Sequence, residues 1–318
     1  MGLPMDRKAS GVAAILRRLE YDARPMPVPS PSSSSLCRRW VPTLVAVGTA
    51  ALLAALPRVA NVAGASTQSS AAPAGHAAPQ PMTDAVRAEL APGGRLRAAL
   101  NYSNFLLVSS RAPEPAGVAP DLARELARRA NATVEFVGYE NAGLAADAAR
   151  EQAWDVAFIG AEPARADVIT FTPAYVEIEA GFLVPGNSKV FAVADVDQPD
   201  VRIVSAARAA YTLYLQRTLK HATLVEVDGI QGAADRFVRD NADVLASLMP
   251  RLLDDVVRIP GMRIVPGAFT AVQQSIGVPK ERTAAAAYLA AFAAEITTSG
   301  LLARLITTHK ADGLTIAK

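Results

Sequence analysis

Residues 154–160 read Trp-Asp-Val-Ala-Phe-Ile-Gly, the clearest fold signal in the chain. The run Asp155–Gly160 is short and apolar and ends in glycine, which is typical of a strand buried on both faces of a sheet. Upstream, Thr133–Val137 alternates like a strand, and Leu122–Arg129 carries an apolar stripe that predicts a helix, with Asp121 placed to cap it. Strands that alternate with helices predict βαβ units and a mostly parallel sheet.

The same alternation continues on both sides of this stretch and starts again in the second half of the chain. Strands are predicted at Leu96–Leu100, Val190–Ala194, Val201–Val204, Thr223–Val227 and Met262–Val265, and a strand or strand-like turn at Val244–Leu248. Helices are predicted at Ala142–Arg150, Ala209–Lys220, Ile230–Arg239, Thr283–Thr298 and Leu301–Thr308. Extended joints near 184–188 and 273–275 separate the two α/β units. We therefore expect a first lobe built from 84–186 and 273–318, and a second lobe built from 187–272.

The first 83 residues are not expected to belong to either lobe. A Pro/Ser-rich stretch at 25–36 precedes Arg38 and Arg39, an uncharged run at 40–57, and small residues around Ala65. This order predicts an n-region and signal peptide over 1–65, with cleavage after Ala65, followed by a tether over 66–83. An uncleaved membrane anchor is the alternative, and whether the natural start is Met1 or Met26 stays open.

Composition excludes several classes of protein. The 32 Lys and Arg residues against 30 Asp and Glu give a net charge of only +2, which argues against a dedicated nucleic-acid binder. The single cysteine, Cys37, excludes an internal disulfide and a cysteine-based zinc or iron–sulfur site. The His, Asp and Glu residues are not spaced like metal ligands. The sequence also has no glycine-rich loop of the kind that binds a nucleotide. We expect no cofactor.

Four stretches resemble the motifs of a known family in order and spacing. They are Gly117–Ala123, the Asp155-Val156 strand followed by Arg165 and Phe171–Tyr175, Ala210–Leu215, and Gln273–Lys280. Together they resemble the bacterial periplasmic solute-binding proteins of family 3, the polar-amino-acid type that serves ABC importers. The resemblance implies a type II periplasmic binding protein-like fold, with two Rossmann-like lobes, a ligand cleft and a two-segment hinge. It also implies a monomer in the periplasm that delivers a small solute to an inner-membrane permease.

The resemblance points to Arg165 as the residue that holds a ligand carboxylate through a bidentate pair. In this chain, Gly160 and the residues up to Ala164 lack the hydroxyl groups that the family often has before that arginine. A surface arginine paired with Glu162 or Asp167 is the alternative. Gly160 itself ends the preceding strand and is expected at the site.

Further ligand contacts are expected after the first strand and at the start of a second-lobe helix. Asn101, Tyr102, Asn104 and Phe105 follow the first strand, although Tyr102 and Phe105 are as readily explained as core residues. In the second lobe, Tyr211 opens a helix whose first amides could bind a carboxylate. Arg208 precedes it, and is either a source of charge at the site or a solvated side chain.

Leu248 stands where family members that bind α-amino acids commonly carry an acidic residue. Without a carboxylate there, a ligand ammonium would be desolvated and unpaired, which is costly. The sequence therefore predicts a carboxylate-bearing or neutral polar solute rather than an ordinary zwitterionic amino acid.

An enzyme or a sensor on the same fold is the alternative function. A dehydratase-like enzyme would need an acid or base in the cleft, and Glu162, Glu177 and Glu179 are the carboxylates that the sequence places near it. Glu177 and Glu179 alternate on one side of a strand, as solvated pairs commonly do. A sensor would need a separate partner chain for its output. We predict a binding protein without catalytic activity.

Overall fold

The computed structural model describes residues 81–318. The predicted signal peptide and nearly all of the predicted tether lie outside them. The strands are β1 (Arg95–Asn101), β2 (Thr133–Tyr139), β3 (Val156–Gly160), β4 (Ile169–Phe171), β5 (Val176–Pro185), β6 (Arg202–Ala206), β7 (Thr223–Val227), β8 (Val244–Leu248), β9 (Met262–Ile264), β10 (Thr270–Pro279) and β11 (Thr315–Ile316). The helices are α2 (Asp84–Leu90), α3 (Val118–Ala130), α4 (Ala142–Asp147), α5 (Ala210–Thr218), α6 (Ile230–Arg239), α7 (Met249–Arg258), α8 (Thr283–Thr298) and α9 (Leu301–Thr308).

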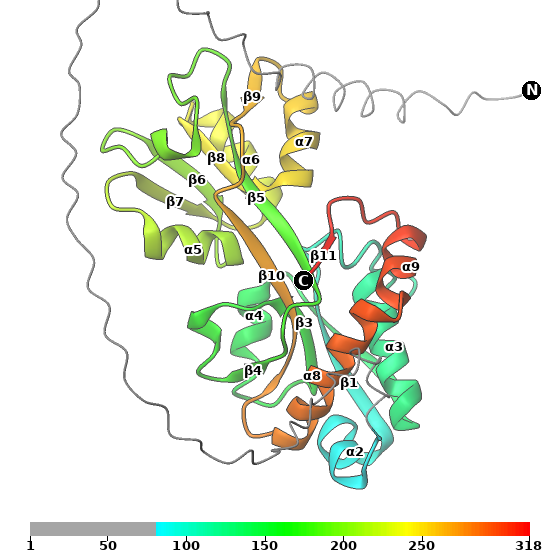
Figure 1. Ribbon diagram of the computed structural model, residues 1–318. Coiled ribbons are helices and arrows are strands. Elements are labelled where there is room, and N and C mark those ends of the chain that lie inside the picture. Colours follow the sequence, from blue (N-terminus) through cyan, green and yellow to red (C-terminus); the bar gives the residue numbers. More distant parts are fainter. Residues whose placement is uncertain (1–80) are drawn as a thin grey trace, which may run out of the picture. The chain divides into compact units, whose positions relative to one another are not determined.

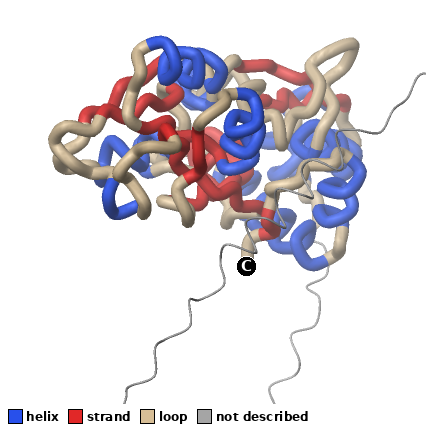
Figure 2. Tube along the Cα trace, turned by 90° about the horizontal axis from the view of Figure 1, so that it is seen from above, coloured by secondary structure: helices blue, strands red, loops and turns tan. Residues whose placement is uncertain are grey.

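These strands form one mixed sheet whose main order is β2-β1-β3-β10-β5-β8-β6-β7 (Figure 1). Strands β1, β2 and β3 are mutually parallel and form the sheet of the first lobe, whereas β6, β7 and β8 do the same in the second lobe. Helices lie along both sides of the strands (Figure 2). This arrangement confirms the predicted α/β class and its two Rossmann-like lobes.

The two lobes are joined by the long antiparallel pair β5 and β10, which crosses from one to the other (Figure 1). Strand β10 pairs with β5 over Thr270–Gln274 and with β3 over Gln274–Gly277. Strand β5 pairs with β8 over Ala180–Leu183, so the chain already reaches the second lobe ahead of the joint expected near 184–188. The two-segment connection is therefore a pair of continuous strands.

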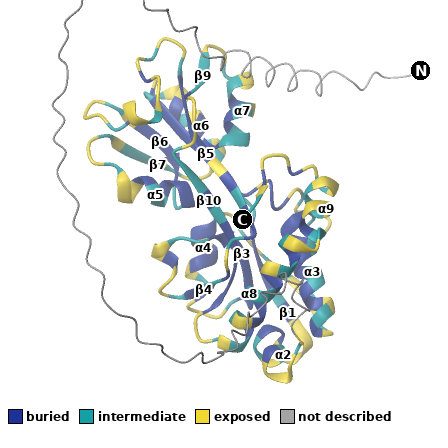
Figure 3. Cartoon of the chain, viewed as in Figure 1, coloured by how far each residue is buried: buried dark blue, intermediate teal, exposed yellow. Residues whose placement is uncertain are grey.

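The buried residues follow the strands, and exposed residues gather on loops and outer helix faces (Figure 3). Helix α3 packs its apolar stripe on β1 and β2, with Leu122 and Leu126 fully buried. The residue before it is Gly117, whose φ of 136° and close approach to the Leu107 carbonyl favour glycine. The helix thus starts before the predicted cap, and Asp121 lies within its first turn, where it contacts Arg124 and His309 rather than capping.

In each lobe, one aspartate precedes the parallel strand that lies next to the β5–β10 pair, β3 or β8, and hydrogen-bonds to the neighbouring strand. In the first lobe, Asp155 is fully buried, accepts the backbone N–H of Arg97, and pairs with the side chains of Arg97 and Arg282. In the second lobe, Asp243 accepts the backbone N–H of Arg202, but both side chains are about half exposed. The same local arrangement is therefore part of the core in one lobe and of the surface in the other.

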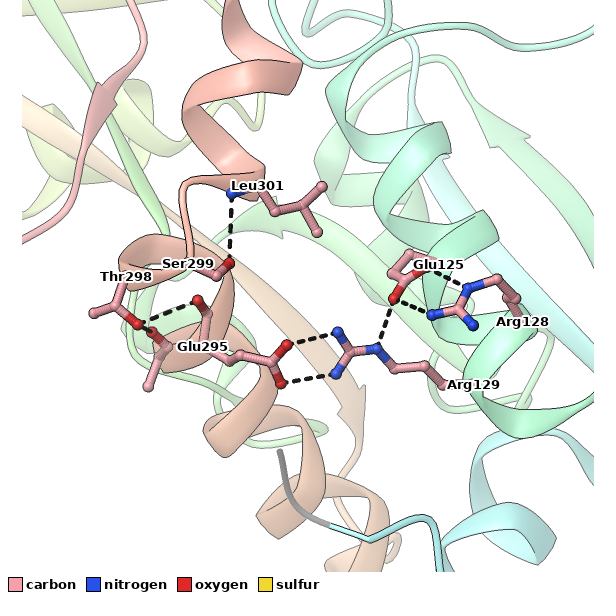
Figure 4. A network of polar contacts seen from close by, with 8 residues as sticks. Glu125, Arg128, Arg129, Glu295, Thr298, Ser299 and Leu301 are labelled. Atoms are coloured by element: carbon pink, nitrogen blue, oxygen red, sulfur yellow. Dashed lines mark hydrogen bonds and ion pairs between the residues drawn. The ribbon is translucent and has the colours of Figure 1, made fainter. Parts of the chain in front are cut away.

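The C-terminal helices return to the first lobe, where α8 packs against α2. An ion-pair network joins α3 to α8: Arg129 bridges Glu125 and Glu295, and Glu125 also pairs with Arg128 (Figure 4). Hydrogen bonds from Arg128 and Arg129 lower the pKa of Glu125 to about 2. These contacts fix the return segment onto the first lobe.

Within residues 81–318, no single helix is long and apolar enough to cross a membrane. Helices α8 and α9 reach that length and composition only as a pair, which is bent by 69° at the break between them.

Most predicted elements are present, although several begin or end at other residues than predicted and one predicted strand is absent. The predicted strand Val190–Ala194 is wrong, because this segment runs as a loop ending in a short 3₁₀ turn at Val193–Asp195. Val190 and Val196 are nonetheless buried in the second-lobe core, so the apolar pattern reflects burial without strand pairing. The predicted helix Ala142–Arg150 ends at Asp147.

Candidate ligand-binding site

A cavity that is partly open to solvent lies between the lobes, at the carboxyl ends of their parallel strands. The first lobe contributes residues from the ends of β1 and β3, the second lobe contributes the start of α5 and the end of β8, and β10 passes between them. The lining residues are Asn101, Ser103, Asn104, Asn141, Ala142, Gly160, Arg165, Ala206, Ala207, Ala209, Ala210, Tyr211, Gly229, Ile230, Leu248, Val272 and Gln274.

Arg165 is the one charged residue in this lining, and only 3% of its surface is exposed. It ends a short 3₁₀ turn (Pro163–Arg165) that follows β3. Its guanidinium donates to the Gly160 carbonyl at 2.6 Å and to the Arg208 carbonyl at 2.9 Å, so it touches both lobes. Burial lowers the pKa of Arg165 to about 10, which still leaves it protonated at neutral pH.

Within the described chain, no carboxylate pairs with Arg165. The surface alternative named Glu162 or Asp167 as partners, but Glu162 pairs with Arg217 of α5 instead, at 2.6 Å. Burying a cation without a counter-ion is expensive unless hydrogen bonds or a ligand compensate it. Two carbonyl contacts leave most of the five guanidinium N–H donors of Arg165 open for a further acceptor.

Gly160 allows the close approach of the two lobes beside Arg165. A Cβ atom at this position would lie 3.0 Å from Cβ of Ala210 and 3.0 Å from Cγ1 of Val272. Any larger residue would therefore separate the lobes or fill the cavity.

Two asparagine side chains line the first-lobe side of the cavity with their orientation fixed by local hydrogen bonds. Asn101 Oδ1 accepts from the backbone N–H and the hydroxyl of Ser103, and Asn104 Oδ1 accepts from the Leu107 N–H. Both side chains are buried. Because their oxygens are engaged, their amide nitrogens remain as donors, and within residues 81–318 neither donates to another group.

The second-lobe side presents the start of α5, which is held by buried hydroxyl groups. Thr212 donates to the Ala206 carbonyl at 2.6 Å and contacts Ser205 at the same distance. No described side chain caps this helix, and Ala210 and Tyr211 line the cavity at its first turn. Free N–H groups at a helix N-terminus favour anions.

Tyr211 and Gln274 add buried polar atoms that have no hydrogen-bond partner among the described residues, the Tyr211 hydroxyl and the Gln274 Oε1. Burial raises the pKa of Tyr211 to about 12, against a smaller opposite effect of the neighbouring Ser247 hydroxyl, so the Tyr211 hydroxyl keeps its proton. Gln274 was expected only as part of the hinge. It lies in the polar run Gln273-Gln274-Ser275 of β10, and this run does not distinguish Gln274 from its two neighbours.

Of the residues expected from the sequence to contact ligand, the structure gathers five at this cavity: Asn101, Asn104, Gly160, Arg165 and Tyr211. Tyr102 and Phe105 instead line an adjoining hollow that shares Ser103, Gly229 and Ile230 with the cavity. The Tyr102 ring packs over Gly138 and under the Arg111 guanidinium.

Arg208 is also outside the cavity lining, although its backbone carbonyl reaches Arg165. Its side chain crosses to the first lobe, where it pairs with Asp147 at 2.8 Å and donates to the Gly143 carbonyl. With Arg217–Glu162, this makes two ion pairs that hold the lobes in contact. Leu248 does line the cavity and is 5% exposed.

The other carboxylates considered from the sequence are placed away from the cavity lining. Glu177 lies on β5 between β10 and β11, and Glu179 is exposed on the same strand. Within residues 81–318, no group of His, Cys, Asp and Glu is arranged to hold a metal ion.

The fold and this cavity are those of the two-lobed, type II periplasmic binding protein-like class. The model of the bacterial extracellular solute-binding proteins, family 3, matches residues 98–311, and the chain belongs to this family. The resemblance found in the sequence is thereby confirmed.

Solved structures share the fold at low sequence identity. The cysteine-binding protein from Campylobacter jejuni has a TM-score of 0.60 and 15% identity, over 74% of this chain and 99% of that one. A mutant of ArgBP from T. maritima has a TM-score of 0.59 and 19% identity, over 71% and 100%. The ancestral amino acid-binding protein AncCDT-1, a precursor of cyclohexadienyl dehydratase, has a TM-score of 0.57 and 18% identity, over 68% and 94%. No curated protein matches the chain.

Proposed function

We propose that this protein captures a small carboxylate-bearing solute between its lobes, outside the cytoplasm, and delivers it to an ABC permease as a monomer. The observation that carries the proposal is Arg165, a buried guanidinium without a carboxylate partner among the described residues, facing a cavity between two lobes. A ligand carboxylate would supply the missing counter-ion through charge-assisted hydrogen bonds.

The surrounding groups support the same ligand chemistry. The amide nitrogens of Asn101 and Asn104 and the start of α5 offer hydrogen-bond donors or positive potential to the cavity. Closure of the lobes around the ligand would remove it from water and strengthen these contacts. A permease can then distinguish the liganded form by its closed lobes.

Thermal unfolding of the purified chain against a panel of amino acids, hydroxy acids, dicarboxylates and aromatic acids tests the proposal. A ligand that binds only the folded state raises the unfolding midpoint. We expect a concentration-dependent rise with at least one carboxylate. No rise with any member of the panel would argue against solute capture. Incubating the hit with the protein and analysing the solution for products tests the enzyme alternative.

The role of Arg165 is tested by Arg165→Met, with Arg304→Met as the matched control. Both variants lose one positive charge, but Arg304 is exposed on α9, remote from the cavity lining. Truncating one partner of a buried charge pair costs about 2–5 kcal/mol, so affinity for the hit should fall at least about thirtyfold in Arg165→Met. Equal affinities in the two variants would show that Arg165 does not bind the ligand.

A further inference from the structure

We infer that the cavity selects carboxylates that carry no ammonium group, such as 2-hydroxy or 2-oxo acids, over the corresponding α-amino acids. This inference rests on the proposed function and names the class of solute within it.

The first argument is the charge of the cavity. Its lining combines one guanidinium, four amide side chains, two hydroxyl groups and apolar or glycine residues. A carboxylate ligand would bring the charge of ligand and lining to zero. A zwitterionic amino acid would leave one uncompensated positive charge, because the described lining residues include no carboxylate to face its ammonium. An unpaired charge that loses its water is strongly disfavoured.

The second argument is the orientation of the neutral polar groups. Local hydrogen bonds engage the oxygens of Asn101 and Asn104, so that their amide nitrogens remain to meet a ligand as donors. An ammonium is also a donor and would oppose them. Gln274 Oε1 is a buried acceptor without a described partner, and a single neutral acceptor suits a ligand hydroxyl better than a cation.

The third argument is the position of Leu248. It ends β8, directly before α7, and only 5% of its surface is exposed. Its side chain makes no capping hydrogen bond to α7. An apolar residue at this edge of the cavity gives an ammonium nothing to pair with, whereas it can pack against the carbon skeleton of a ligand. Leu248 is thus the residue whose chemistry sets this preference.

Matched ligand trios test the inference by calorimetry on the unmodified chain. Each trio holds the side chain constant, as in L-alanine, L-lactate and pyruvate, or L-phenylalanine, phenyllactate and phenylpyruvate. We expect the hydroxy or oxo acid to bind at least about tenfold more tightly than the amino acid of its trio, because the unpaired ammonium costs more than a factor of ten in affinity.

The outcomes separate this inference from the proposed function. Amino acids that bind as tightly as their hydroxy acids would overturn the inference and leave solute capture standing. No binding by any carboxylate, in the trios or in the wider panel, would overturn both.

Leu248→Asp, with Leu248→Asn as its control, tests the residue itself. The two side chains have nearly the same shape, and both can cap α7. Only the aspartate adds a negative charge. We expect Leu248→Asp to move the preference toward the amino acid by tenfold or more relative to Leu248→Asn, with both variants checked for a native-like unfolding midpoint. If the two folded variants had the same preference between amino acid and hydroxy acid, residue 248 would not determine the selectivity of the cavity.

Discussion

Replacing Asp155 by asparagine tests how the strand motif of residues 154–160 stabilises the first lobe. The carboxylate is fully buried and accepts four hydrogen bonds. Three come from Arg97, from its backbone N–H at 2.7 Å, Nε at 3.1 Å and Nη2 at 2.8 Å. The fourth comes from Arg282 Nη1 at 2.6 Å. Asp155 thus joins Arg97 of β1 to Arg282, the residue before α8.

The expected loss follows from this burial. The Arg97 side chain is 26% exposed and that of Arg282 is 12% exposed, so neither guanidinium can be solvated freely once its partner is neutral. In Asp155→Asn, an amide nitrogen would also replace one acceptor and face a guanidinium. Removing one partner of a buried ion pair costs about 3–5 kcal/mol. For a domain of this size, that corresponds to a fall in the unfolding midpoint of roughly 6–20 °C.

Asp243→Asn is the matched control, since Asp243 occupies the equivalent place in the second lobe. Its ion pair with Arg202 spans 3.6 Å between side chains that are 44% and 49% exposed. An asparagine can still accept the Arg202 backbone N–H, so the loss should stay below about 1 kcal/mol. Thermal unfolding followed by circular dichroism compares the two. If both variants lowered the unfolding midpoint by the same small amount, the buried ion pairs of Asp155 would not stabilise the first lobe more than the exposed pair of Asp243 stabilises the second.

Three further predictions concern the lobe contact, the helix network and the cavity. Glu162→Gln should lower the closed-to-open ratio of the unliganded protein two- to fivefold, since a pair whose arginine is 41% exposed contributes about 0.5–1 kcal/mol. Fluorescence transfer between dyes on the two lobes measures this ratio. The charge swap Glu162→Arg with Arg217→Glu should restore the ratio, and a swap that behaves like the single variant would argue against the pair. Glu125→Gln should lower the free energy of unfolding by about 1–2 kcal/mol at pH 7. The difference in this free energy between the variant and the unmodified chain should disappear as the pH falls from 4.5 toward about 2, because the lowered pKa of Glu125 stabilises the folded state only while its carboxylate is charged. Urea midpoints at pH 7 and pH 3 measure this, and a gap independent of pH would contradict it. Gly160→Val should cost about 1–3 kcal/mol of stability and abolish ligand binding, because its Cβ meets Ala210 and Val272; unchanged affinity by calorimetry would show that the lobes need not approach there.

Much of the fold was predictable because its strands and helices carry their own periodicity. The second-lobe elements β7, α6 and β8 begin and end at the predicted residues. The failure at Val190–Ala194 has a different cause, since its apolar residues pack into the core from a loop. Nothing in a local pattern distinguishes an apolar loop from a short buried strand.

The candidate site was only partly predictable, because its key contacts join segments far apart in sequence. The resemblance to the family selected Arg165, but not its hydrogen bond to the carbonyl of Arg208 in the other lobe. Tyr102 follows β1 as predicted, yet it packs on Gly138 and lines the adjoining hollow. Gln274 could be found only once β10 was seen to pass through the cleft. Side-chain direction after a strand end is set by tertiary packing, which the sequence does not display.

The central claim is that Arg165 binds the carboxylate of a captured solute, and a crystal structure of the protein with its tightest-binding carboxylate tests it most directly. The account predicts a ligand enclosed between the lobes, with both carboxylate oxygens within hydrogen-bonding distance of the Arg165 guanidinium. A ligand that occupies the cavity with its carboxylate turned away from Arg165, or that binds elsewhere on the protein, would contradict it.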